Sequence, residues 1–321
     1  MKIVISRKPL HSSNELLINP DYLNLFGHEN GWIYGYENNR ICYIVSFFDK
    51  RIWFFHYMQM QSGVIEMGSA TIDQISFLEA VIAKVKSERV YDFIGQPKTS
   101  ALYNRCPEGA ICAPFGSYIV DLTLDQNILW KNIHSKHKNV IKRAVKNDVT
   151  IEFGDNNFKD AYKIIKKTLV RNKMVMIDRQ ELRSSLKRLN KNSLIGCSYL
   201  KGIVQSSVII LYDMNTAYYI WGGTNDKLSL GSNNLLHWQA IKKLKSLGVN
   251  NYDFVGARIN TKDKKKLGIQ RFKKRFGSEL RQGYLWKYPV KKWKFLLFSL
   301  LYKIRTGKGD LIDQERDSTN L

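Results

Sequence analysis

A loop in the second half of the chain has the residue types of an anion-binding site. The segment NTAYYIWGG ends in Gly222 and Gly223, and a polar loop leads to Gly231. Ser232 and Asn233 then begin SNNLLHWQAIKKLKSLG, a predicted helix that Gly248 closes. The start of a helix offers free N–H groups and a positive dipole end, which suit a phosphate or a developing oxyanion. An ordinary β-turn-α unit has the same pattern, and this motif alone favours that simpler interpretation.

The elements around this loop resemble those of GNAT N-acyltransferases. In that family the corresponding helix start holds the pyrophosphate of an acyl-CoA. The resemblance implies that Gly222, Gly223, Gly231, Ser232 and Asn233 bind substrate. The family's Gln/Arg-x-x-Gly-x-Gly/Ala signature is absent, because LSLGSNN keeps one glycine.

A second motif follows between residues 251 and 280. A predicted strand with the pattern YDF-x-G contains Asp253, and a basic loop then leads to RFKKRFG. This ordered set resembles the FemABX family, the aminoacyltransferases that build the interpeptide bridges of peptidoglycan. Phe272-Lys273 and Phe276-Gly277 fall on the family motif. The resemblance covers most of residues 120–290.

The family resemblance implies a fold and a reaction. The basic segment Trp130–Phe153 is similar to the one that joins two GNAT-like lobes in the family. The implied reaction is attack by an amine of a lipid- or nucleotide-linked precursor on an activated acyl carbonyl. The implied co-substrate is aminoacyl-tRNA or acyl-CoA, with no permanently bound cofactor. The long insertion that forms a coiled-coil arm in staphylococcal members is missing, so the chain is more similar to the compact members.

Lys273 is the residue that the resemblance places at the reaction centre. A fixed ammonium can stabilise the negative charge that forms on the carbonyl oxygen in a site shielded from water. Arg271, Lys274 and Arg275 flank it, so without the preceding motif Lys273 reads as one residue of a basic run.

Five further residues are candidates for the site. Asp253 ends a strand beside it, and either orients the amine, accepts its proton or stabilises a turn. Tyr218 and Tyr219 point to opposite faces of one strand, so that one lines the acceptor groove and the other fills the core. Phe272 and Arg258 complete the predicted substrate-binding set.

Patterning predicts an α/β protein of two tandem lobes with mixed sheets flanked by helices. Residues 32–67 read as a meander, followed by a helix and a short strand, and residues 150–255 repeat that order. We predict a first lobe at 1–148 that includes a basic helix at 126–147, a catalytic lobe at 149–285, and a tail at 286–321.

The net charge of +23 favours a polyanionic partner: nucleic acid, lipid headgroups or a pyrophosphate-carrying substrate. The four cysteines form no C-x-x-C motif, and His134 and His137 read as solvated, so no metal site and a reduced cytoplasmic protein are predicted. No window reaches the roughly 18 apolar residues of a membrane-spanning helix.

The tail predicts an amphipathic helix in PVKKWKFLLFSLLYKIR, followed by a frayed acidic end. Its apolar residues at helical spacing and bracketing lysines fit a helix at an anionic membrane surface, at the inner face of the plasma membrane. Packing on the first lobe is the alternative, and both can hold.

These patterns together predict an acyl- or aminoacyltransferase that acts on peptidoglycan precursor or on an amino sugar of capsule or O-antigen, with tRNA as a possible partner. A non-catalytic nucleic-acid-binding protein is one alternative, supported by the basic surplus with interleaved aromatic residues. A membrane-surface scaffold is another.

Overall fold

The computed structural model describes residues 1–68, 73–96 and 103–319. The strands are β1 Lys2–Ser6, β2 Glu29–Glu37, β3 Arg40–Ile52, β4 Phe55–Met60, β5 Ile65–Glu66, β6 Phe93–Gly95, β7 Ile111–Asp121, β8 Thr150–Phe153, β9 Ser193–Leu200, β10 Ile203–Tyr212, β11 Thr216–Thr224, β12 Asn251–Asp253 and β13 Glu279–Pro289. The α-helices are α1 Pro20–Asn24, α2 Gln74–Glu88, α3 Gln126–Asn132, α4 Ser135–Lys146, α5 Phe158–Arg171, α6 Arg179–Leu189, α7 Ser232–Ser246, α8 Lys264–Lys274, α9 Lys292–Thr306 and α10 Leu311–Thr319.

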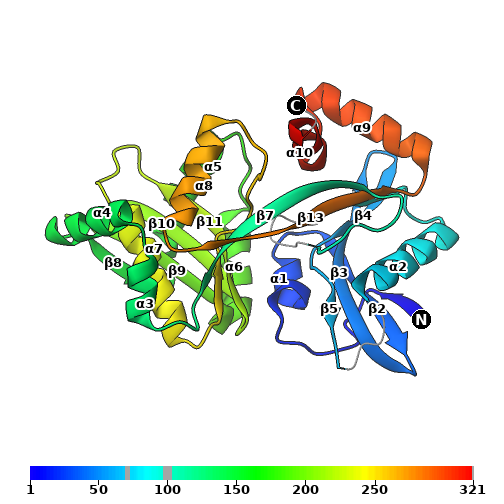
Figure 1. The fold of residues 1–321 in the computed structure, drawn as a ribbon, viewed down its shortest axis with the longest axis horizontal. Helices are drawn as coiled ribbons and strands as arrows, with labels where there is room; N and C mark the ends of the chain where they lie inside the picture. The colour runs from blue at the N-terminus through cyan, green and yellow to red at the C-terminus, as the bar shows by residue number, and fades with distance from the viewer. Residues whose placement is uncertain (69–72, 97–102, 320–321) are drawn as a thin grey trace.

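Two α/β lobes lie side by side, and the long strands β7 and β13 run between them (Figure 1). The hydrogen-bonded strand order is β1-β2-β3-β4-β6-β13-β7-β12-β11-β10-β9-β8. The link between the halves is narrow, because β13 pairs with β6 only at Tyr288 and Pro289 but with β7 from Glu279 to Lys287. The predicted α/β fold of mixed sheets flanked by helices is confirmed, with the two sheets joined end to end.

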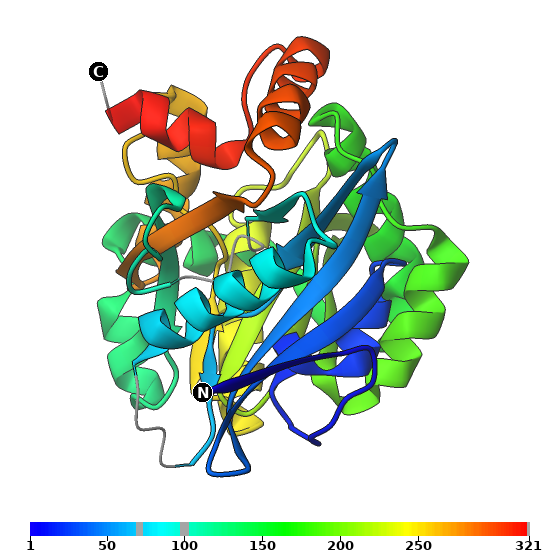
Figure 2. The ribbon, with the colours of Figure 1, turned by 90° about the vertical axis from the view of Figure 1, so that its right-hand side faces the viewer.

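A shared hydrophobic core fixes the lobes against each other. It combines the segment around α1, including Leu16 and Tyr22, with Phe158 and Ile165 of α5 and Leu182 of α6. The carboxylate of Asp213, in the turn after β10, accepts a hydrogen bond from the backbone N–H of Leu16 at 2.8 Å. Such a dry, hydrogen-bonded interface favours a fixed relation between the lobes over free hinge motion. In the first lobe, α2 lies across the sheet (Figure 2).

The basic segment at 126–147 forms two helices and not one. Ile133 and His134 have extended backbone between α3 and α4, and the His134 ring accepts a hydrogen bond from Lys136 N–H as an N-cap. Ile133 is buried, which explains the break: the kink turns this side chain into the core. Ile141 and Ala144 join the same core as α7, so the segment packs on the second half of the chain.

Three further expectations are corrected. His137 is buried and not solvated, because its ring packs on Phe272 and Phe276. The structure joins Cys106 to Cys112 in a disulfide, where the sequence suggested four reduced thiols. The acidic end forms α10, whose Ile312 and Glu315 are fully buried, so it is docked and not frayed up to residue 319; the last two residues lie outside the described part.

Among the described residues, no helix is long and apolar enough to cross a membrane, and no cluster of His, Cys, Asp or Glu side chains could hold a metal ion.

Candidate functional site

A cleft of about 580 Å³ lies where the two lobes and the C-terminal helix meet. Its walls are mostly aromatic and aliphatic, with a few polar groups, as is usual in ligand sites. The lining residues are Tyr22, Phe26, Gln59, Gln96, Met174, Tyr219, Ile220, Trp221, Phe254, Val255, Ile269, Lys273 and Leu311. Among the described residues, Lys273 is the one cation in this lining, and it comes from the FemABX-like motif.

A β-bulge explains why three consecutive residues of β11 reach the cleft. Ile209 of β10 pairs with Trp221, and Ile210 pairs with Tyr219, so Ile220 is an extra residue in β11. A bulge interrupts the alternation of side chains and re-aims them, which is why bulges occur beside active sites. Without it, Tyr219 and Trp221 would line one face and Ile220 the other.

Lys273 is buried near the end of α8, and its side chain is aimed at a turn. Its Nζ donates hydrogen bonds to the carbonyl oxygens of Val255 and of Gly256, the latter at 2.6 Å. Burial lowers the pKa of Lys273 to about 8, and the nearby charge of Asp253 acts in the opposite direction. Lys274 is exposed. The segment is helical, and the two side chains diverge because successive residues of an α-helix are about 100° apart.

The turn that receives Lys273 has a strained backbone. Val255 has φ of 51° and Gly256 has φ of 67°. A β-branched residue at positive φ is an outlier, and such strain persists where surrounding contacts enforce it. Those contacts come from Asp253, whose Oδ1 accepts the Val255 N–H at 2.7 Å and the Ser117 hydroxyl.

Asp253 therefore acts on the turn and not on the substrate. It is 3% exposed and does not line the cleft. Burial raises the pKa of its carboxyl group, while the Ser117 and Val255 hydrogen bonds and the Lys273 charge lower it. Of the alternatives that the sequence left open, the geometry favours the turn-stabilising one.

Tyr219 and Gly222 are coupled by packing. A Cβ atom built on Gly222 would lie 1.6 Å from the Tyr219 hydroxyl oxygen, so glycine is required there for this rotamer. Tyr219 lines the cleft and packs edge-on against His237. Tyr218 packs against the shared core instead. This agrees with the predicted division of roles between the two tyrosines.

The start of α7, where the sequence suggested an anion-binding site, is covered by the backbone of neighbouring helices. A Cβ on Gly231 would lie 2.0 Å from the carbonyl oxygen of Val140 in α4, and one on Gly223 would lie 2.7 Å from that of Ile164 in α5. Ser232 is fully buried, and neither it nor Asn233 lines the cleft. These glycines and Ser232 allow close backbone packing, which corrects the expectation of a ligand contact.

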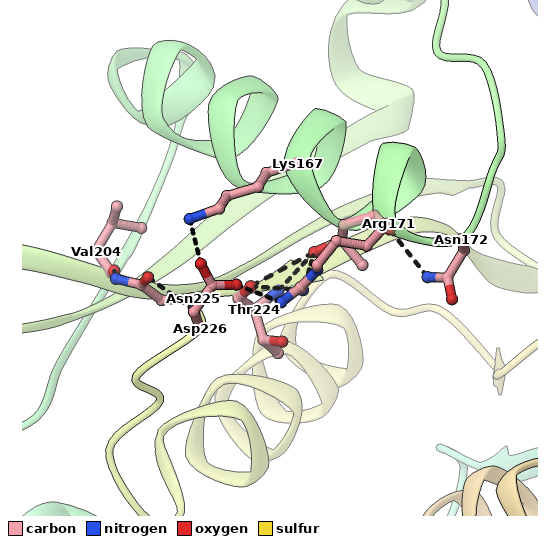
Figure 3. A network of polar contacts seen from close by, with 8 residues as sticks. Lys167, Arg171, Asn172, Val204, Thr224, Asn225 and Asp226 are labelled. Atoms are coloured by element: carbon pink, nitrogen blue, oxygen red, sulfur yellow. Dashed lines mark hydrogen bonds and ion pairs between the residues drawn. The ribbon is translucent and has the colours of Figure 1, made fainter.

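An ion-pair network also occupies the loop before α7 (Figure 3). Asp226 pairs with Lys167 and, at 2.5 Å, with Arg171, both from α5. Arg171 also donates to the carbonyl oxygen of Thr224 at 3.1 Å. Two cations of α5 that face this loop are thus already paired with a carboxylate from the loop itself.

Behind Lys273 lies a buried aromatic cluster that includes Phe272. His137 Nε2 lies 3.1 Å from the carbonyl oxygen of Phe272, and burial lowers the pKa of His137 to about 4. His237 Nδ1 lies 2.9 Å from the Tyr252 hydroxyl, and burial lowers the pKa of His237 to about 3. Both rings are neutral at pH 7, so they add no charge beside Lys273. Phe272 supports α8 and does not line the cleft.

Arg258 is engaged by the chain itself. It forms an ion pair with Glu315 and donates to Gln314 Oε1 at 3.0 Å, both in α10. No pattern in the sequence indicates this contact, because it joins residues that are 56 and 57 positions apart. Gln59, Gln96 and Trp221 were also missed, since nothing in a strand pattern marks which residues face a neighbouring lobe.

The sequence model of the FemAB family matches residues 175–303, a range that contains Lys273, its acceptor turn and most of α9. This part of the chain is similar to the FemAB family. A crystal structure of FemX is similar over 92% of this chain and 99% of that one, with a TM-score of 0.70 and 12% identity.

Two other solved structures have the same fold. L-PGS from Bacillus licheniformis has a TM-score of 0.54 and 10% identity, covering 92% of this chain and 98% of that one. A conserved protein of unknown function from Bacteroides thetaiotaomicron has a TM-score of 0.54 and 11% identity, covering 83% and 89%. No curated protein sequence matches the chain. The comparisons confirm the FemABX-like resemblance, and they show the α/β fold that this chain shares with FemX.

Proposed function

We propose that the protein is an aminoacyl- or acyltransferase that forms an amide on an amine of a cell-envelope precursor. The observation that carries this proposal is the buried Lys273 ammonium in the lining of a largely aromatic and aliphatic cleft between the lobes, where no other described residue is a cation. The amine nitrogen attacks the acyl carbonyl carbon, and the carbonyl oxygen gains negative charge. Collapse of that intermediate expels the donor's oxygen or sulfur leaving group, and the amine loses a proton. A fixed cation stabilises this oxyanion more strongly where it is itself buried, as Lys273 is.

Gln59 and Gln96 are suited to hold the acceptor. Both residues line the cleft, and their side-chain Oε1 atoms are buried without a hydrogen-bond partner among the described residues. Unsatisfied buried acceptors are costly, so a ligand N–H group in this position would be favourable. Both residues belong to the first lobe, opposite Lys273. The first lobe would thus orient the amine and the second would activate the carbonyl.

The donor that fits best is aminoacyl-tRNA. A GNAT-type cradle for the pyrophosphate of CoA needs open N–H groups at the start of α7, and this start is covered by Val140. A groove of about 540 Å³ along α5 has Lys159, Lys163, Lys166 and Arg179 in its lining, in addition to the two cations that pair with Asp226, and these four charges suit a nucleic-acid backbone. Peptidoglycan precursor, or an amino sugar of capsule or O-antigen, remains the proposed acceptor.

The test is a donor-resolved assay with purified protein. Isotope-labelled aminoacyl-tRNA or acyl-CoA is mixed with envelope precursors extracted from a strain lacking the gene, and mass spectrometry follows new amides. Label arriving from tRNA in a salt-sensitive reaction supports the proposal. Transfer from acyl-CoA alone would overturn the proposal that aminoacyl-tRNA is the donor. Absence of transfer from both donors would overturn the proposal that the protein is a transferase.

A further inference from the structure

Helix α9 uses one face to pack on the first lobe. Phe295 is buried, and the Phe298 ring lies 4.8 Å from Phe93 and 5.2 Å from Phe55, measured between centroids. These two phenylalanine side chains account for the docking of α9 on β4 and β6. A helix that is docked in this way normally carries polar residues on its other face.

The opposite face of α9 is apolar as well. Trp293, Leu296, Leu300 and Ile304 follow one another at spacings of three and four residues, and their exposed fractions are 64%, 66%, 56% and 71%. Four large apolar side chains on successive turns form a stripe, and isolated exposed residues would need no such explanation.

The tip of the β3–β4 hairpin extends this stripe. Trp53 is 69% exposed and Phe54 is 54% exposed, and Trp53 has φ of 55°, which makes the turn tight. Lys294 joins the two elements: its Nζ lies 5.9 Å from the Phe54 ring and 5.8 Å from the Trp293 ring, and it donates to the Phe54 carbonyl oxygen at 3.3 Å.

Cations surround this apolar surface. Arg51 in the hairpin and Lys292, Lys303 and Arg305 in α9 are exposed. The nearby carboxylate of Asp92 is buried and is neutralised by Lys291 and Lys294. On the α10 side, Asp317 lines a hollow with Lys303 and Leu300. The positive charges therefore exceed the negative ones around the stripe.

We propose that α9 and the β3–β4 hairpin tip together dock this protein onto an anionic lipid bilayer. Trp at the interface, aliphatic residues toward the acyl chains and lysines near the headgroups are the pattern of a helix that lies in the membrane plane. A nucleic-acid partner would not explain the exposed Leu and Ile side chains, because a phosphate backbone offers them no apolar surface. A second copy would bring the same cations face to face, which is unfavourable at a net charge of +23. The proposal stands independently of the proposed reaction.

The experiment is vesicle co-sedimentation of the full chain, with phosphatidylcholine vesicles and with vesicles that also contain phosphatidylglycerol. The double variant Trp53→Ser/Leu296→Ser is compared with the control Ile203→Ser, which removes a 60% exposed side chain at the β9–β10 turn. All three side chains are exposed, so circular dichroism and melting temperature should be unchanged.

The parent and the control should bind the anionic vesicles, more weakly as salt rises, and the double variant should bind at least about tenfold more weakly. Equal binding by variant and control would overturn the proposal, as would absence of binding by the parent. If light scattering shows that the parent is a dimer and the double variant is a monomer, the surface binds a second copy of the chain and not a membrane.

Discussion

Arg258 and Glu315 form a buried ion pair that ties α10 to the loop after β12. Glu315 is fully buried, and the Arg258 side chain is 17% exposed. Leu311 of the same helix lines the cleft. The C-terminal helix is therefore part of the cleft wall, and its position depends on a contact that removes one charge of each sign from water.

The first prediction follows from this ion pair. Glu315→Ala should lower the free energy of unfolding by about 3 kcal/mol, because it leaves Arg258 without its partner in a largely dry site. Urea denaturation measures this, and hydrogen exchange should increase first in residues 311–319. Asp317→Asn, at an exposed position of α10, is the control and should change stability by less than about 0.5 kcal/mol. Equal effects would mean that Arg258 is not held by Glu315.

The second prediction separates packing from ligand binding at the start of α7. Gly231 has φ of +85°, and an added Cβ would meet the backbone of Val140. Gly231→Ala should therefore destabilise the protein by about 2–4 kcal/mol. Gly268, within α8, has nothing within 4 Å of an added Cβ, so Gly268→Ala should stabilise by roughly 0.5–1 kcal/mol. If Gly231→Ala is as stable as the parent but loses donor affinity, the cradle interpretation is restored.

The sequence identified the fold through element order and located the central lysine through an ordered motif. Both are local signals: strand and helix periods are set by a few residues, and YDF-x-G followed by RFKKRFG lies within 30 positions. The break at Ile133 and His134 was missed because it depends on which side chain the core of α7 accepts. Tertiary packing decides that, and period alone does not.

The glycines show the same limit more sharply. Gly222, Gly223 and Gly231 read as a loop open to an anion, yet each is required by a different neighbour: a tyrosine hydroxyl, a carbonyl of α5 and a carbonyl of α4. A glycine in a sequence indicates only that another atom lies close to its Cα or that its φ is positive. Whether the close atom belongs to a ligand or to the protein is a property of the folded chain.

The third prediction concerns pH. The folded pKa of Lys273 is about 8, below its ordinary value of 10.5, so above pH 8 the folded protein loses this proton before the unfolded chain does. Stability should therefore rise between about pH 8 and 10.5 from this group, while the catalytic charge is lost. The ratio of kcat/KM for the parent to that for Lys273→Met, which cancels ionisation of the acceptor amine, should fall as pH rises above 8. A ratio that stays constant with pH would show that the charge of Lys273 is not used.

The last prediction concerns Lys273 directly. Lys273→Met keeps an unbranched stem and removes the charge, so it should lower kcat by roughly 10²–10³-fold, as loss of one oxyanion donor does. Lys274→Met, one position along α8 and exposed, removes the same charge from the surface and should change kcat by less than about twofold. The comparison controls for bulk charge, which at +23 would otherwise confound any lysine substitution.

The Lys273→Met variant leaves the Val255 and Gly256 carbonyl oxygens without their donor, so both variants are assayed well below their melting temperatures. Lys273→Arg should recover little, because a guanidinium is larger than an ammonium group and planar, and the position of the Lys273 side chain is buried. If the two methionine variants lose activity equally, Lys273 is only part of a basic surface; the FemAB-like fold would remain, but the catalytic centre would have to lie elsewhere in the cleft.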